Sequence, residues 1–278
     1  MKLIYENSVG RVTLRGGTDA IYNITVISGL SIPETLAETV RYPGVAGQEV
    51  TAVSHLPRTI TIAGDICDKT GKHTAFAANV FSKSGTVYIA TSRSMRKIGC
   101  RPLSFLPAKR KGTYVPFTLQ LIADNPYFED TAEPIATGAT KTKLLKAPFI
   151  LPQAFSNRKS EARVINRGSV PIEPEFKISA AKEASCPNGI LIENRTTGAK
   201  LKLHTGLLEN ETIVIDIGNR KITGSVQGNL IGVLSVDTPM SKFTLCEGVN
   251  DILITAEDEA ATLFAYCHYQ NRYAEAVL

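Results

Sequence analysis

The residues best suited to chemistry in this sequence are cations gathered between residues 92 and 112. The segment SRSMRKIGCRPLSFLPAKRKG contains seven basic side chains and no acidic one. We term these residues the basic belt: Arg93, Arg96, Lys97, Arg101, Lys109, Arg110 and Lys111. Clustered Lys and Arg side chains can neutralise phosphates and bind nucleic acid through salt-dependent electrostatics. The first question is therefore whether the belt holds a polyanion.

Charge is distributed unevenly along the chain, because the net charge of +5 falls entirely within residues 1–132. Three interpretations of the belt stay open. It is a solvated edge hairpin whose cations prevent strand-on-strand aggregation, a surface that faces an acidic partner subunit, or a surface that a polyanion passes. None of the usual motifs of duplex recognition occurs, so we expect no sequence-specific DNA binding.

Motifs of catalysis and of nucleotide or metal binding are absent from the sequence. There is no G-x-G-x-x-G, no G-x-x-x-x-G-K-[ST], no G-x-S-x-G and no H-E-x-x-H. The five cysteines include no C-x-x-C pair, which favours reduced thiols of a protein made in cytosol. We therefore predict no enzyme activity, no catalytic residue, no cofactor and no metal site.

The elements that position these residues follow from an alternation of apolar and polar side chains, which predicts a mainly β protein. The alternation is clearest in three segments, 21–26, 58–66 and 114–124. The residues expected on the buried faces are Tyr22, Ile24, Val26, Ile60, Ile62, Ile66, Val115, Phe117, Leu119 and Leu121. Helical spacing predicts one helix over 72–85, and residues 34–40 after Pro33 are a weaker helical candidate.

Short alternating segments continue through the C-terminal half, separated by turn signals. Gly218-Asn219 predicts a two-residue hairpin loop, because Gly supplies the positive φ of a type II′ turn. This spacing of strands is typical of a β-sandwich. The length of 278 residues favours two domains, and the Thr-, Ala-, Gly-, Lys- and Pro-rich stretch between 131 and 160 is the expected junction. We place the domains at 1–135 and 136–278, and no segment is apolar enough to span a membrane.

Segments along nearly the whole chain, in the expected order, resemble the distal tail proteins (Dit) of long-tailed phages and prophages. The segments are YENSVGRVTL, YNITVISGLSIPE, PGVAGQEV, RTITIAGDI, LIADNPYFED, IENRTTGAKLKLHTGLLENETIVIDIGNRKI, LCEGVNDILIT and YQNRY. The family-signature residues within them, for which we expect structural roles, are Asp124, Pro126, Tyr127, Phe128, Asn194, Gly198 and Asp216.

The resemblance implies an N-terminal β-barrel-like domain with one packed helix and a C-terminal galectin-like β-sandwich. It also implies that the first domains of six copies form a ring at the virion tail tip, which connects the tail tube protein to tail-tip or baseplate proteins. The genomic DNA would pass transiently through the central channel, and no membrane is involved. Such a hub would be made and assembled in the bacterial host cytoplasm. We hypothesise that part of the segment from Arg93 to Lys111 lies at ring contacts or near the channel, which would explain its lack of acidic residues.

A second function stays open at this stage, which is that of a host-surface carbohydrate-binding adaptor acting through the C-terminal sandwich. The sequence contains no Trp, the flat aromatic residue on which sugar faces often lie. Its length also leaves no room for the large carbohydrate-binding insertions of some distal tail proteins. A structural hub is therefore the favoured interpretation.

Overall fold

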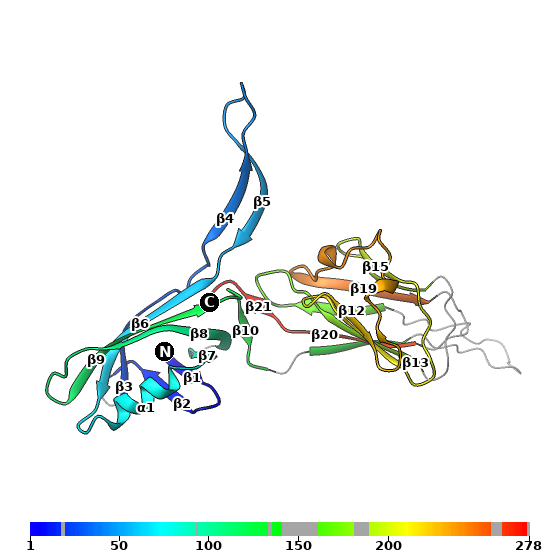
Figure 1. The fold of residues 1–278 in the computed structure, drawn as a ribbon. Coiled ribbons are helices and arrows are strands. Elements are labelled where there is room, and N and C mark those ends of the chain that lie inside the picture. The colour runs from blue at the N-terminus through cyan, green and yellow to red at the C-terminus, as the bar shows by residue number, and fades with distance from the viewer. Residues whose placement is uncertain are drawn as a thin grey trace, which may run out of the picture. The chain divides into compact units, whose positions relative to one another are not determined.

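The computed structural model describes residues 1–17, 20–92, 94–132, 135–140, 161–180, 189–256 and 263–276. The chain forms two compact units, which are coloured by position along the chain in Figure 1. The first unit is Met1–Thr131 together with Tyr273–Leu278, and the second unit is Ala132–Arg272. The predicted division at 135 assigned the whole C-terminal part to the second domain, whereas the structure groups the residues from Tyr273 onward with the first unit.

Strands dominate both units, so the prediction of a mainly β protein is confirmed. The elements of the first unit are β1 (Lys2–Glu6), β2 (Arg11–Arg15), β3 (Tyr22–Ser28), β4 (Thr35–Val40), β5 (Glu49–His55), β6 (Arg58–Cys67), α1 (Lys72–Val80), β7 (Gly85–Ala90), β8 (Met95–Pro107), β9 (Tyr114–Ala123) and β10 (Phe128–Asp130). The final short strand β21 (Arg272–Tyr273) begins on the last residue of the second unit and ends on Tyr273 of the first.

The first unit contains a closed, barrel-like sheet in the order β8-β7-β1-β2-β3-β6-β9. Closure depends on β8, a strand of 13 residues. Its first half pairs with β7 and its second half pairs with β9, with a register shift between Pro102 and Ser104. A bulge of this kind bends a strand, which lets one strand serve two neighbours. The predicted barrel-like domain is thereby confirmed.

The barrel core is built from the alternating side chains that the sequence indicates. All the predicted inward residues of β6 and β9 are buried. Of the predicted inward residues of β3, Tyr22 is buried and Ile24 is half-buried, whereas Val26 is 59% exposed. The register between β3 and β6 shifts between Ile24 and Val26, and this irregularity reverses the alternation beyond it.

The predicted helix over 72–85 is present as α1, which ends at Val80. Ala77 and Val80 are its buried residues, and the Phe81 ring packs edge-on against Tyr5 at a centroid distance of 5.3 Å. Asp68 precedes the helix and accepts hydrogen bonds from the backbone N–H groups of Gly71 and Thr74 at 2.7 and 2.8 Å. Burial raises the pKa of the Asp68 carboxyl, but these hydrogen bonds outweigh burial and hold the pKa well below its usual range.

The helix considered for residues 34–40 is wrong, because this segment is strand β4 and pairs antiparallel with β5. Threonine and valine suit an extended backbone, and the partner strand decides between the two conformations. Every residue of β4 and β5 is exposed except His55, which is half-buried. Figure 1 shows the two strands projecting from the barrel as a hairpin, which we term the arm, residues 35–55.

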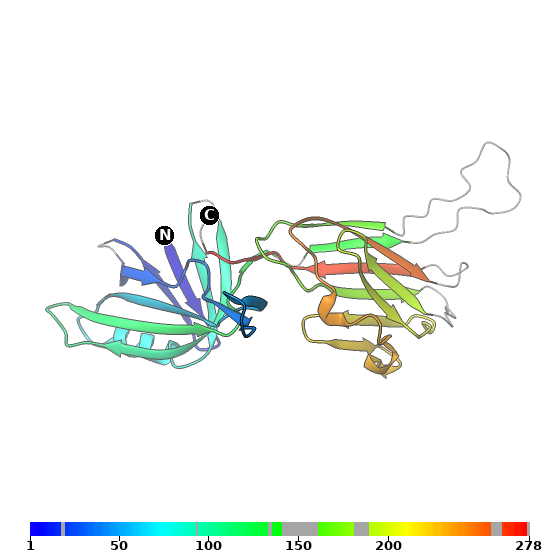
Figure 2. The same ribbon diagram turned by 90° about the horizontal axis from the view of Figure 1, so that it is seen from above.

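The second unit is a sandwich of a six-stranded sheet, β11-β20-β13-β16-β17-β18, and a four-stranded sheet, β12-β19-β14-β15. Figure 2 shows this unit from above. The predicted C-terminal sandwich is therefore confirmed. Its elements are β11 (Ile135–Thr140), β12 (Glu161–Asn166), β13 (Glu175–Ala180), β14 (Ile190–Asn194), β15 (Ala199–Leu203), β16 (Thr212–Asp216), β17 (Lys221–Gly224), β18 (Gly228–Asn229), η1 (Ile231–Val233), η2 (Met240–Lys242), β19 (Gly248–Ala256) and β20 (Leu263–Tyr269).

The hairpin between β16 and β17 differs from the predicted two-residue loop. Asp216 pairs with Lys221, so the loop has four residues, and the positive φ of 53° falls on Arg220 rather than on Gly218. The Asp216 carboxylate accepts hydrogen bonds from the backbone N–H and the side-chain amide of Asn219 at 2.9 and 2.7 Å. This side-chain bonding stabilises a longer turn that the Gly-Asn pair alone does not indicate.

Candidate interaction surfaces

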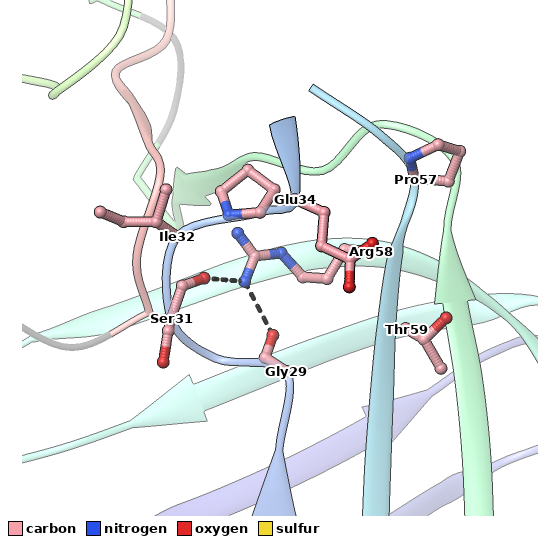
Figure 3. A pocket seen from close by; sticks show the side chains of 8 residues that line it. Gly29, Ser31, Ile32, Glu34, Pro57, Arg58 and Thr59 are labelled. Atoms are coloured by element: carbon pink, nitrogen blue, oxygen red, sulfur yellow. Dashed lines mark hydrogen bonds between the residues drawn. The ribbon is translucent and has the colours of Figure 1, made fainter. Parts of the chain in front are cut away.

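A buried arginine, Arg58, lies at the base of the arm. It borders a cavity of about 260 Å³ lined by Gly29, Ser31 to Glu34 and Pro57 to Thr59 (Figure 3). The Arg58 guanidinium donates from Nε to the Pro126 carbonyl at 2.8 Å and from Nη1 to the carbonyls of Gly29, at 2.7 Å, and Ser31. Its Nη2 donates to the Ala274 carbonyl at 2.5 Å. These bonds occupy four of the five N–H donors of the guanidinium, so the cavity offers little of this cation to an anionic ligand.

The residues of the LIADNPYFED signature surround Arg58 and the arm base. Phe128 is fully buried, and the Arg58 guanidinium lies over its ring at 4.6 Å from the centroid. The Tyr127 ring packs edge-on against His55 at a centroid distance of 5.7 Å. With the Pro126 carbonyl bonded to Arg58, three signature residues hold one corner of the barrel, where the arm begins. Cation–π and charge-assisted contacts of this kind are strongest when water is excluded.

A second buried arginine comes from the basic belt. Arg96 is 5% exposed, its Nη1 donates to the Glu275 carbonyl, and its guanidinium lies over the Tyr273 ring at 3.8 Å from the centroid. Ala276 is fully buried and its N–H donates to the Leu30 carbonyl at 3.0 Å. Arg96 therefore binds the chain's own C-terminal segment and is not available to a polyanion.

The remaining belt residues do not form one surface. Lys97 is half-buried and faces Glu129 across β8 and β10, and exposed Arg101 forms an ion pair with Asp124 at 3.3 Å. Arg93 lies outside the described residues. Lys109, Arg110 and Lys111 are exposed together on the turn between β8 and β9, which we term the basic tip. The structure thus brings three of the seven predicted residues together in the exposed part of the belt.

The arm presents two different faces. Cross-strand pairing places Ala37 opposite Val53 and Thr39 opposite Val50, so these residues share a face without a charged side chain. Val53 is 62% exposed. The opposite face carries the carboxylates of Glu38 and Glu49 together with the exposed side chains of Leu36 and Val40. An isolated two-stranded hairpin is marginally stable in water, and an apolar exposed face is typical of an interaction surface.

The signature residues of the second unit have internal roles. The Asn194 side chain is fully buried, and its Nδ2 donates to the Thr244 carbonyl at 3.0 Å and to Asn250 Oδ1 at 3.1 Å. Its Oδ1 accepts from the Thr196 N–H at 3.1 Å. Gly198 closes the same turn with a positive φ of 75°, and its N–H donates to the Asn194 carbonyl at 2.7 Å. These residues fix the β14–β15 turn.

Some structural residues were missed from the sequence, foremost Arg58 and Glu211. The Glu211 carboxylate is fully buried and accepts from the Leu208 and Gln227 N–H groups at 3.1 and 2.9 Å. Burial raises the pKa of Glu211, but its hydrogen bonds, led by those from Gln227, outweigh burial and lower the pKa overall. No motif marks either residue, because their partners come from separate loops.

Metal binding and thiol reactivity can be judged from the described residues. Among those residues no three of His, Cys, Asp and Glu lie close enough to hold a metal ion. Burial raises the pKa of the Cys100 and Cys267 thiols to about 12, so neither is nucleophilic at neutral pH. No helix within the described ranges is long and apolar enough to cross a membrane.

Comparison with known proteins identifies the class to which this architecture is similar. Residues 167–273 match the family described as the siphovirus-type tail component, C-terminal domain. The fold is similar to the crystal structure of the SPP1 Dit (gp 19.1) protein, a hub of the adsorption apparatus in phages that infect Gram-positive bacteria. That match has a TM-score of 0.61 and 11% identity, and it covers 90% of this chain and 92% of the other.

The phage P2 baseplate, in its activated conformation with Ca, contains a chain with a TM-score of 0.48 and 12% identity, with coverage of 97% of both chains. No curated protein sequence matches this chain. The family match and the shared fold together confirm the resemblance to siphophage distal tail proteins.

Proposed function

We propose that this chain is a structural hub of a siphophage tail tip. Six first units close into a ring, which connects the tail tube protein to the tail-tip or baseplate proteins and leaves a channel for transient passage of genomic DNA. The observation that carries the proposal is the fold shared with SPP1 Dit, which extends over 90% of this chain and includes both units.

The first unit supports this role physically. A ring needs head-to-tail interfaces whose rotation closes, each burying on the order of 800 Å² per partner. The closed barrel provides a stiff body, and the exposed arm provides contact surface beyond it. Buried Arg58 and Arg96 hold the chain's end in this body. The function requires docking alone, with no bond made or broken.

The channel is compatible with DNA passage when its wall binds DNA weakly. Each neutralised phosphate adds salt-dependent affinity and therefore drag. Because Arg96 is buried and Arg101 pairs with Asp124, the exposed cations of the belt lie chiefly on the basic tip. We expect weak, nonspecific DNA affinity and location at the virion tail tip, after synthesis and assembly in the bacterial host cytoplasm.

Mass measurement and imaging test the proposal. Light scattering of the purified chain, alone and with tail partners, should give a particle of six copies of 30.0 kDa each. Negative-stain images should show rings, and tail particles should contain the protein at the tip. Absence of the protein from tail particles would contradict the hub. Saccharide binding by the full chain, without such particles, would support the carbohydrate-binding adaptor instead.

A further inference from the structure

We propose that the arm of one copy docks against the basic tip of the next copy, so that these two surfaces form the contact between neighbouring subunits. This inference rests on the proposed hub function and names the surfaces that the ring would use. Its first support is the arm itself, which presents an uncharged face with Val50 and Val53 more than half exposed. Tyr42 and Val45, at the arm's turn, are also exposed. A hairpin of this composition gains stability when a partner covers it.

The second support is charge. The segment 32–56 contains Glu34, Glu38 and Glu49 against the single cation Arg41, so it is net acidic. None of these three carboxylates forms an ion pair with another residue in the described ranges. Glu38 and Glu49 share the face opposite the apolar one. Leu36 and Val40 share this face and are also exposed, so apolar side chains lie beside the two carboxylates. The carboxylates are therefore free to pair with another chain while the apolar side chains of the same face pack against it.

The basic tip has the complementary composition. Lys109, Arg110 and Lys111 are consecutive and exposed, and exposed Leu106 and Tyr114 flank them on β8 and β9. The Arg110 guanidinium donates to the Lys69 carbonyl at 3.0 Å, which holds it without neutralising its charge. An acidic and apolar arm thus matches a basic and apolar tip, and complementary charges of this kind fix partner and register.

The third support is geometry within the first unit. Strands β6 and β9 pair along their whole length, from Arg58 opposite Ala123 to Cys67 opposite Tyr114. The arm leaves the barrel at Arg58, whereas the basic tip lies beside Tyr114, at the other end of the same strand pair (Figure 1). A strand of ten residues spans roughly 33 Å. The arm therefore cannot contact the basic tip of its own copy.

Complementary surfaces at opposite ends of one body are the requirement for a head-to-tail contact. Each copy then offers its arm to one neighbour and its basic tip to the other, and the contact repeats until the rotation closes. Interfaces of standard size use about 20 to 30 residues on each side, and the segment 32–56 contributes a large part of one side.

Zero-length cross-linking of carboxylates to amines in assembled tail particles tests this contact directly. We expect cross-linked peptides that join Glu38 or Glu49 to Lys109 or Lys111, and such links must come from two copies because one copy keeps these residues too far apart. Arm peptides linked only to other proteins, or no arm–tip link in particles that contain the protein, would overturn the inference while leaving the hub intact. Absence of the protein from the particles would contradict the proposed hub function, and the inference that rests on it would then fail as well.

Charge reversal provides the second test. The double variants E38K/E49K and K109E/K111E should each lower recovery of the protein in tail particles by roughly tenfold, because several exposed ion pairs become repulsive at every contact. Combining the four substitutions should restore recovery, since the charges again match. K221E/K242E reverses two exposed lysines of the second unit and should have no effect. Equal recovery of the two single-surface variants and wild type, or no rescue by their combination, would overturn the inference.

Discussion

The guanidinium of Arg96 lies over the ring of Tyr273, 3.8 Å from its centroid, although the second unit separates these two residues in the sequence. The same side chain donates to the Glu275 carbonyl. The chain therefore leaves the first unit after Thr131 and returns to it at Tyr273, so the second unit is connected to the first at both of its ends. This arrangement changes the interpretation of the basic belt, because one of its cations is part of the fold.

Arg96 and Arg101 have different roles, because Arg96 is buried within the fold whereas Arg101 is exposed. The substitution R96S should lower the free energy of unfolding by about 2–4 kcal/mol, because it removes a buried cation–π contact and leaves the Glu275 carbonyl without this donor. R101S should cost less than about 0.5 kcal/mol, because its ion pair with Asp124 is exposed. Urea denaturation measures both values. Equal destabilisation by the two variants would contradict the assignment of Arg96 to the fold.

Arg58 provides the second prediction, since its donors hold four backbone carbonyls. The substitution R58K keeps the charge but replaces a planar fork by a single ammonium, so it should destabilise the first unit by about 2–4 kcal/mol. Hydrogen exchange should also accelerate at the Ala276 amide, which donates to the Leu30 carbonyl beside this cluster. R15K, at an exposed position of β2, is the matched control. Unchanged exchange at Ala276 in R58K would contradict the prediction.

Asp68 makes stability depend on pH. Its folded-state pKa is lowered, so its contribution is fully present above the unfolded-state pKa of about 4 and is lost as the pH falls below that value. The midpoint of thermal unfolding should therefore fall from pH 5 toward pH 3. D68N cannot ionise, so it should be less stable at neutral pH and should show a shallower fall. A pH profile of D68N parallel to that of wild type would contradict this role of the carboxylate.

The second unit gives a prediction from the turn that Asn194 holds. N194A removes the donor to the Thr244 carbonyl and one donor to Asn250 Oδ1, which still accepts from the Cys246 N–H, and this loss should cost about 1–3 kcal/mol. N219A is the control, because Asn219 lies on the exposed β16–β17 turn and its loss should cost less than about 0.5 kcal/mol. Urea denaturation followed by far-ultraviolet circular dichroism compares them. A larger effect at Asn219 than at Asn194 would be the contrary result.

The strands of the barrel were predictable because their pattern is local. Inward residues of β6 and β9 recur at every second position. This alternation predicts the buried face correctly wherever no bulge shifts the register. Val26 was misplaced because the bulge in β3 depends on its pairing with β6. The arm was misassigned for a related reason. Its strands cover no core, so no buried face imposes an alternation that identifies them.

The belt was predictable as a composition but not as a surface. The burial of Arg96 depends on residues 273–276, which are distant in sequence. No motif in these residues indicates that they contact Arg96. Arg58 was missed for the same reason, since its acceptors are backbone carbonyls of three separate segments. The types of side chain in a segment do not indicate whether its backbone carbonyls accept a hydrogen bond from a distant arginine. The sequence therefore indicates a cluster of cations, but it does not distinguish the exposed basic tip from the buried and paired cations beside it.

The basic tip should carry most of the nonspecific DNA affinity of the unassembled chain, because its cations are exposed. Nonspecific affinity depends on how many phosphates are neutralised, and the logarithm of the binding constant falls with the logarithm of salt by about 0.9 for each phosphate. In the unassembled chain, whose basic tip no neighbour covers, the triple variant K109S/R110S/K111S should reduce that slope by roughly 2–3. The control variant K97S/R101S should leave the slope nearly unchanged, because Lys97 faces Glu129 and Arg101 pairs with Asp124. Fluorescence anisotropy with a labelled duplex across a salt series measures both slopes. If the salt dependence falls more in K97S/R101S than in the triple variant, DNA binds to Lys97 and Arg101 of β8 and does not bind to the basic tip.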